Sequence, residues 1–109
     1  MGASKTDFFT SAQNELAGLA KALAHPARIA ILQHLLKVNS CVCGDIVEEL
    51  PLAQPTVSQH LKELKNSGLI KGNIEGNSIC YCINETTWSK YKGLMVHLFD
   101  SYKPLNKCC

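Results

Sequence analysis

Two prolines that stand four positions apart constrain the fold of this chain more than any other feature. Pro51 stops a short amphipathic helix that Asp45 caps, and Pro55 opens a longer helix that Gly68 ends. Proline suits a first helical turn because it has no amide hydrogen to leave unpaired. The inward-facing residues of the two helices are Ile46, Val47, Leu50, Val57, Leu61 and Leu64. The pattern predicts two helices joined by a tight turn, which is a helix-turn-helix.

Apolar residues at helical spacing predict three more helices, over residues 8–23, over Pro26–Lys37, and before Pro104, which ends the last one. The apolar positions are Phe8, Ala12, Leu16, Leu19 and Leu23 in the first, Ile29, Leu32 and Leu36 in the second, and Trp88, Tyr91, Met95, Leu98 and Tyr102 in the last.

The segment LIKGNIEGNSICYCIN, directly after the helix-turn-helix, predicts a two-stranded ribbon. Its turn is the cluster Glu75-Gly76-Asn77, and Ile79, Tyr81 and Ile83 alternate onto one face. A ribbon at this place is a wing. The expected fold is therefore mainly α with a small two-stranded β wing, a winged helix-turn-helix in the order α-α-α-α-β-β-α.

Length and charge limit the classes of protein that fit. A chain of 109 residues holds one modest core, so we expect a single domain over residues 1–109. No stretch has the uninterrupted apolar length of a membrane span, and the start lacks a signal-peptide core, which indicates a cytoplasmic protein without a membrane partner. The net charge of +2 permits binding to DNA without indicating it.

Polar side chains cover the outer face of the helix that Pro55 opens. Amides, hydroxyls and lysines near the start of a recognition helix suit the major groove of DNA. The candidate DNA-binding residues are Gln54, Pro55, Thr56, Ser58, Gln59, Lys62 and Lys65. The wing that follows favours this function over a merely solvated face, and a module that binds only other proteins is the alternative. His60 flanks the buried stripe, so we expect it to pack and to hydrogen-bond.

The first and last helices carry more apolar surface than a small winged helix can bury. We expect a second copy of the chain to bury the surplus, so that the N- and C-terminal helices form a homodimer. Two-fold symmetry would then place two recognition helices about 34–36 Å apart on the inverted repeat of a double-stranded operator.

The stretches KALAHPARIAILQHL, LPLAQPTVSQHLKELKNSGLI and EGNSICYCIN resemble the ArsR family of winged-helix repressors, over roughly residues 17–88. The resemblance implies a homodimeric repressor, not an enzyme, that leaves its operator when an inducer binds, often a metal or metalloid ion. Two positions depart from the family. Ala53 stands where a capping Ser or Thr is usual, and the wing tip carries Glu75 without an arginine. We therefore expect DNA contact through the helix rather than the wing.

Six cysteines fall into three close pairs, Cys41/Cys43, Cys80/Cys82 and Cys108/Cys109. Thiolates are soft metal ligands. Two residues two positions apart on a regular helix cannot both hold one ion, so Cys41 and Cys43 would need an extended or unwound turn. Their CVC motif resembles that of the arsenic- and cadmium/lead-responsive branches of the family. Two ligands are too few for tight binding, and the tail after Pro104 offers Cys108 and Cys109.

We therefore expect no cofactor for folding and one regulatory ion, As(III) or Sb(III) first and otherwise Cd, Pb or Zn. Its expected ligands are Cys41, Cys43, Cys108 and Cys109. Cys80 and Cys82 share a strand face, and we interpret them as small packing residues on a half-exposed strand. The alternative regulator is a redox switch, in which Cys41/Cys43 and another pair form disulfides under oxidant. The CxC spacing disfavours a thiol oxidoreductase, whose motif is CxxC.

Overall fold

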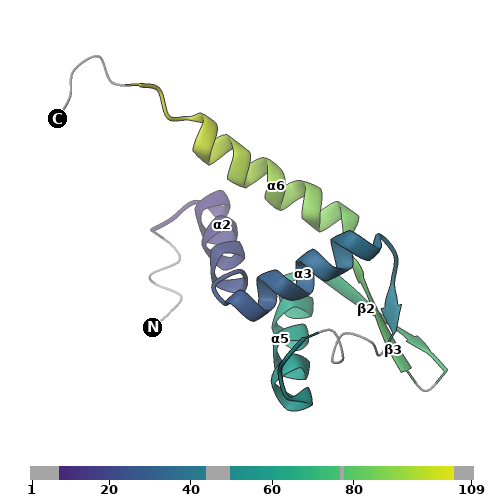
Figure 1. Cartoon of the computed structure of the whole chain (residues 1–109). Helices are drawn as coiled ribbons and strands as arrows, with labels where there is room; N and C mark the ends of the chain where they lie inside the picture. The colour runs from purple at the N-terminus through teal and green to yellow at the C-terminus, as the bar shows by residue number, and fades with distance from the viewer. Residues whose placement is uncertain (1–7, 44–49, 77, 105–109) are drawn as a thin grey trace.

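A computed structural model of the chain describes residues 8–43, 50–76 and 78–104. Four helices and three strands follow one another in the described part (Figure 1). They are α2 (Ser11–Ala22), α3 (Pro26–Val38), β1 (Val42–Cys43), α5 (Gln54–Ser67), β2 (Ile70–Glu75), β3 (Ser78–Ile83) and α6 (Glu85–Asp100). The short helix predicted over residues 45–50 lies almost wholly outside the described residues, as does the Cys108/Cys109 tail.

Helix α2 begins at a capping box. The hydroxyl of Thr10 accepts a hydrogen bond from the amide of Gln13, and the Gln13 side chain accepts one from the amide of Thr10. This reciprocal pair explains why the helix starts three residues later than its apolar stripe predicts. Leu19 is buried on α2, whereas Phe8, ahead of the cap, is 85% exposed.

Helix α3 confirms its predicted start at Pro26 and runs one residue past its predicted end. The predicted buried face is partly wrong. Ile29 and Leu36 are exposed, and the buried residues are Ala27, Ile31, Leu32 and Leu35. The segment is apolar on nearly every side, so its pattern does not indicate which side meets the core.

Helix α5 matches the prediction closely. Val57, Leu61 and Leu64 are buried, and Gly68 ends the helix with a positive φ of 88°. Only a residue without a Cβ adopts this left-handed conformation without strain. The polar outer face of α5 is therefore held by a stripe that packs into the core.

Strands β2 and β3 form the predicted wing, paired antiparallel from Ile70 with Ile83 to Glu75 with Ser78. Gly76 opens the two-residue turn with a positive φ of 62°, as such hairpins require. The structure adds a third strand that was not predicted. The short strand β1 pairs antiparallel with β3, so the sheet order is β1-β3-β2 and β3 is the central strand.

Helix α6 begins three residues before its first predicted apolar position, because the side chain of Asn84 accepts a hydrogen bond from the amide of Thr87. It ends at Asp100, so Tyr102 lies beyond it. Trp88, Tyr91 and Met95 pack against the core, yet no residue of α6 is buried. Figure 1 shows α6 lying along the outside of the other helices.

Candidate functional site

The outer face of α5 presents the predicted DNA-binding residues to solvent. All seven are exposed: Gln54, Pro55, Thr56, Ser58, Gln59, Lys62 and Lys65. The amide nitrogen of Gln59 donates a 3.0 Å hydrogen bond to a carboxylate oxygen of Glu63, one turn further along. The position before the helix confirms the missing cap, since Ala53 is the N-cap residue and makes no side-chain cap bond. At the start of α5, Pro55 has no amide hydrogen, and the amides of Thr56 and Val57 both donate to the carbonyl oxygen of Ala53.

A polar cluster fixes α5 against α3. The Nε of Arg28 donates a 3.1 Å hydrogen bond to Nδ1 of His60, and the ring of His25 lies 4.3 Å from the ring of His60. His60 is 8% exposed, which confirms that it packs and hydrogen-bonds. Burial lowers the pKa of His60 first, and the charges of His25 and Arg28 lower it further.

The cluster extends to α2. The Arg28 guanidinium also donates to the carbonyl oxygens of Lys21 and Ala22, which close α2. His25 caps α3, because its Nδ1 accepts from the amide of Ala27. One arginine and two histidines therefore set the position of α5 relative to α2 and α3.

The pairing of β1 with β3 brings Cys41, which precedes β1, and Cys43 of β1 beside Cys80 and Cys82 of β3. Val42 pairs with Tyr81 and Cys43 with Cys80, so the same register places Cys41 opposite Cys82. Cys41 and Cys82 form a disulfide, with their Cα atoms 4.4 Å apart. Cys80 is also disulfide-bonded. Sulfur atoms from residues about 40 positions apart in sequence thus share one site.

The structure corrects one interpretation of these cysteines. Cys80 and Cys82 are 2% and 7% exposed, because they lie on the central strand and not on a half-exposed ribbon. Cys41, at the sheet edge, is exposed. The side chains of Cys43, Cys108 and Cys109 lie outside the described part, so the predicted ion ligands stay a prediction. Within the described residues, no three His, Cys, Asp or Glu side chains gather as metal ligands.

The redox alternative predicted disulfides between Cys41/Cys43 and another pair, but sequence reasoning did not identify Cys80/Cys82 as that pair. A signal for this pairing is present, because both CxC motifs have the period of two that puts alternate strand residues on one face. Strand β1 has two residues, which is too short to produce a recognisable strand pattern. Its pairing partner is therefore visible only in the folded chain.

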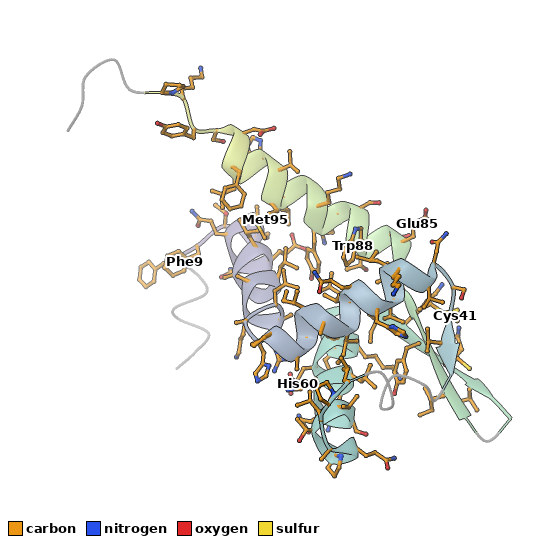
Figure 2. All side chains as sticks on the ribbon, viewed as in Figure 1. Phe9, Cys41, His60, Glu85, Trp88 and Met95 are labelled. Atoms are coloured by element: carbon orange, nitrogen blue, oxygen red, sulfur yellow. A yellow bond between two sulfur atoms is a disulfide. The ribbon has the colours of Figure 1, made fainter. Side chains whose placement is uncertain are left out.

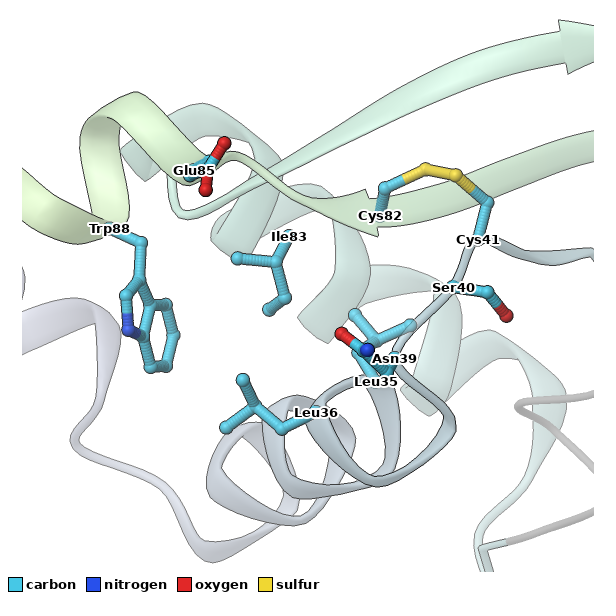
Figure 3. Close-up of a pocket in the computed structure, with 9 residues that line it drawn as sticks. All are labelled: Leu35, Leu36, Asn39, Ser40, Cys41, Cys82, Ile83, Glu85 and Trp88. Carbon is cyan, nitrogen blue, oxygen red and sulfur yellow. A yellow bond between two sulfur atoms is a disulfide. The ribbon is translucent and has the colours of Figure 1, made fainter.

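The Cys41–Cys82 disulfide borders a cavity of about 270 Å³ between α3, β3 and the start of α6 (Figure 3). Its walls include Leu36, Ser40, Cys41, Cys82, Glu85 and Trp88. The indole of Trp88 and the side chain of Leu36 face one another across it. Glu85 supplies the one charged side chain among the described residues that line the cavity.

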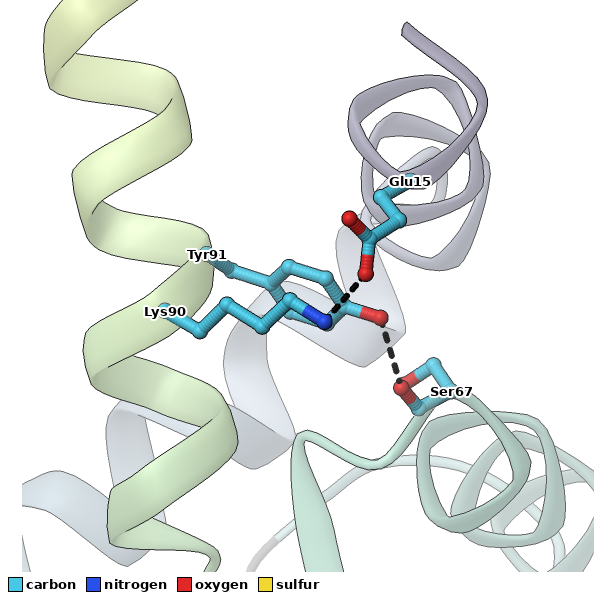
Figure 4. Close-up of polar contacts among 4 residues, drawn as sticks. All are labelled: Glu15, Ser67, Lys90 and Tyr91. Carbon is cyan, nitrogen blue, oxygen red and sulfur yellow. Dashed lines mark hydrogen bonds and ion pairs between the residues drawn. The ribbon is translucent and has the colours of Figure 1, made fainter. Parts of the chain in front are cut away.

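Helix α6 is tied to the body by two polar contacts (Figure 4). Lys90 forms an ion pair with Glu15 of α2, and this hydrogen bond raises the pKa of Lys90 above its usual value. The hydroxyl of Tyr91 donates a 3.2 Å hydrogen bond to the carbonyl oxygen of Ser67 at the end of α5. These two contacts join α6 to α2 and to the last residue of α5.

Apolar side chains remain uncovered at both ends of the described chain. Figure 2 shows Phe9 pointing away from the helices. The large apolar residues exposed on or near α6 and at the N-terminal end are Phe8, Phe9, Val96, Leu98, Phe99 and Tyr102. A hollow of about 410 Å³ with mostly apolar walls opens between α2 and α6, beside Leu23, Met95 and Val96. None of the described helices has the length and apolarity needed to cross a membrane.

Comparison with known proteins places the fold. The chain superposes on the structure of HlyU from Vibrio cholerae with a TM-score of 0.67 and 27% sequence identity, over 84% of this chain and 98% of that one. This agreement confirms the winged helix-turn-helix.

The chain is also similar to known transcriptional repressors over a little more than half of its length. The transcriptional repressor SmtB of Mycobacterium tuberculosis is 44% identical over 63 residues, which cover 58% of this chain and 46% of that protein. The chain thus spans about half the length of this relative. The arsenical resistance operon repressor of Staphylococcus xylosus is 36% identical over 70 residues, or 64% of this chain and 66% of the relative. The transcriptional repressor SdpR of Bacillus subtilis is 38% identical over 66 residues, or 61% of this chain and 72% of the relative.

The model of the family described as "Bacterial regulatory protein, arsR family" matches residues 25–71, from the histidine that caps α3 to the first part of the wing. Together with the relatives and the shared fold, this match establishes that the chain belongs to the arsR family of bacterial regulatory proteins.

Proposed function

We propose that this protein is a transcriptional repressor that binds an inverted-repeat operator as a homodimer and releases it when cysteines of β1 and β3 form disulfides. The observation that carries the proposal is the register that sets Cys41 opposite Cys82, with a disulfide between them. Thiol oxidation is therefore the trigger that the geometry supports best.

Operator binding is assigned to α5. Its outer face carries the amide of Gln59 and the ammonium groups of Lys62 and Lys65, all exposed. Gln pairs with adenine in the major groove, and Lys binds phosphate or guanine. Relatives named as transcriptional repressors support this assignment.

Dimerisation is assigned to α6 and the N-terminal segment. The exposed apolar residues at these two places, with the apolar hollow between α2 and α6, exceed what a small monomer leaves open to water. A second copy that covers this surface would give the two-fold symmetry that an inverted repeat requires.

The sulfur site is well placed to act on DNA binding. Strand β1 lies between α3 and the segment that leads to α5, and β3 forms the wing. A bond between Cys41 and Cys82 fixes the end of α3 to the wing, and so limits how wing and α5 adjust to a duplex. We expect the reduced form, without this bond, to bind the operator more tightly than the disulfide form. The difference in binding free energy between the two forms then sets how much operator affinity is lost on oxidation.

A thiophilic ion is the second candidate trigger. In the reduced protein, thiolates from Cys41, Cys82 and their neighbours Cys43 and Cys80 would offer the third ligand that the CVC motif alone lacks, and Cys108 or Cys109 remains an alternative source. Soft ligands of this kind suit As(III) or Sb(III), and also Cd, Pb or Zn. A relative named as an arsenical resistance operon repressor favours this candidate.

One titration separates these proposals. The full-length protein would be titrated onto the promoter upstream of its own gene in three states: fully reduced, oxidised with diamide, and reduced with arsenite. We expect tight binding in the reduced state and at least a tenfold loss after oxidation. Cys41→Ser and Cys82→Ser should each remain bound under oxidant, whereas Cys109→Ser should respond as the parent does.

Release by arsenite without oxidant would establish the ion as the trigger instead. Equal affinity in all three states would contradict control by thiols. If the protein does not bind the promoter in any of the three states, its assignment as a repressor is contradicted.

A further inference from the structure

The geometry points to Cys41–Cys82 as a thiol–disulfide exchange site for a small aminothiol, which enters the neighbouring cavity and reduces the disulfide by attack on Cys41. The inference rests on the proposed function only for its consequence, the return of the protein to its DNA-binding form. The exchange itself concerns residues that lie in and around the cavity and needs no DNA.

The two sulfur atoms differ in access. Cys41 precedes the edge strand β1 and is exposed, whereas Cys82 lies on the central strand and is 7% exposed. Thiol–disulfide exchange requires a thiolate to approach one sulfur while the other leaves. Attack therefore falls on Cys41, and Cys82 is the leaving group.

A cation stands on the far side of the leaving group. Lys71 of β2 pairs directly with Cys82 in the sheet register. Residues opposite one another in an antiparallel pair share a face, with Cβ atoms about 4.5–5.5 Å apart. Cys41, Cys82 and Lys71 thus follow one another across three adjacent strands. As the bond to Cys41 breaks, the ammonium group of Lys71 stabilises the negative charge that develops on Cys82.

The cavity selects the incoming thiol. Its volume of about 270 Å³ suits a small molecule. Leu36 and Trp88 give it apolar walls, and Glu85 places a carboxylate at its edge (Figure 3). A carboxylate attracts a thiol that carries an ammonium group and repels one that carries a carboxylate. A small aminothiol satisfies both size and charge.

The reaction is balanced as follows. The thiolate RS⁻ attacks the sulfur of Cys41, forming R–S–S–Cys41, and the electron pair of the broken bond leaves on Cys82 as a thiolate. A second RS⁻ then attacks the R sulfur of the mixed disulfide, forming RSSR and the thiolate of Cys41. Two aminothiols are oxidised to one disulfide, the protein gains two electrons, and the two protons of the aminothiols pass to the cysteines or to water.

The test follows exchange in the oxidised full-length protein, without DNA. Cysteamine and 3-mercaptopropionate would each be added anaerobically, the reaction quenched in acid at intervals, and free cysteines alkylated and mapped by mass spectrometry. Rates would be divided by the thiolate fraction of each reagent. We expect cysteamine first on Cys41, with Cys82 the first alkylated position of the pair.

Three variants sharpen the result. Lys71→Gln should slow exchange about two- to fivefold, the range expected for one partly exposed charge. Lys103→Gln, which removes an exposed lysine beyond the far end of α6, should leave the rate unchanged. Glu85→Gln should reduce the preference for cysteamine over 3-mercaptopropionate by a similar factor, and far-UV circular dichroism would check that each variant is folded.

Cysteamine found on Cys82, or equal rates for the two reagents in the parent protein, would overturn the inference. If exchange proceeds as expected but reduction does not raise operator affinity, the exchange site is supported and the proposed function is contradicted. If exchange shows no preference for Cys41 over Cys82 or for cysteamine over 3-mercaptopropionate, while oxidation still weakens operator binding, the exchange site is contradicted and the proposed function is not.

Discussion

Arg28 and His60 join the recognition helix to the helix before it through a hydrogen bond in which the neutral ring of His60 is the acceptor. A protonated imidazole carries hydrogen on both nitrogens and cannot accept this bond. Because Arg28 also closes α2, protonation of His60 would loosen the contact between three helices at once. The placement of α5 therefore depends on a histidine that stays uncharged.

The first prediction concerns pH. Burial lowers the pKa of His60 in the folded protein below its ordinary value of 6.5. The unfolded chain then binds a proton more readily than the folded one, so the free energy of unfolding is largest above pH 6.5 and falls as the pH drops through the interval below it. His60→Asn keeps an acceptor and removes the titration. Urea denaturation from pH 5 to 8 should show a flatter dependence in the variant, and equal slopes would contradict this account.

The second prediction concerns DNA contact. Gln59→Ala removes an amide from the exposed face of α5 and should weaken operator binding by about 1–3 kcal/mol, as for one lost base contact. Far-UV circular dichroism should be unchanged, because Gln59 is exposed and its side chain donates its hydrogen bond to Glu63 of the same helix. The exposed Gln33 of α3 gives the control, since Gln33→Ala should bind as the parent does. Unaltered affinity of Gln59→Ala in a mobility-shift assay would count against docking through this face.

The third prediction concerns the missing cap. Ala53→Ser supplies a hydroxyl that accepts from the amide of Thr56, at the third helical position, and should raise the free energy of unfolding by about 1 kcal/mol. At fixed protein concentration this corresponds to a rise of about 4–8 °C in Tm. Ala24→Ser makes the same chemical change in the loop between α2 and α3 and should have little effect. A Tm that does not differ between the two variants would show that the cap bond fails to form.

The fourth prediction concerns assembly. Phe99 is 68% exposed near the end of α6, on the surface that we propose for dimerisation. Phe99→Glu places a charge in an apolar interface, and should raise the dimer dissociation constant at least tenfold, because an aromatic residue at an interface commonly contributes more than about 1.4 kcal/mol. Sedimentation velocity over a range of concentrations measures it, with Ser89→Glu on the same helix as the control. A parent protein that is monomeric at all concentrations would contradict the dimer.

Local patterns were sufficient to predict most elements. The stripe of Val57, Leu61 and Leu64, with Pro55 at one end and Gly68 at the other, predicts α5 because each of these signals acts within a few residues of chain. The turn at Gly76 predicts the wing for the same reason. The polar face of α5 follows directly from the position of the buried stripe.

What the sequence by itself determined is therefore the four helices of the described part, the wing and the polar face of α5. The tertiary structure decided which side of α3 is buried, because an almost wholly apolar helix packs by whichever side its neighbours reach. It also decided that Cys41 meets Cys82, because the pairing of β1 with β3 joins segments 41 residues apart and its register is set by packing around Val42 and Tyr81. Local spacing carries no information about such a contact.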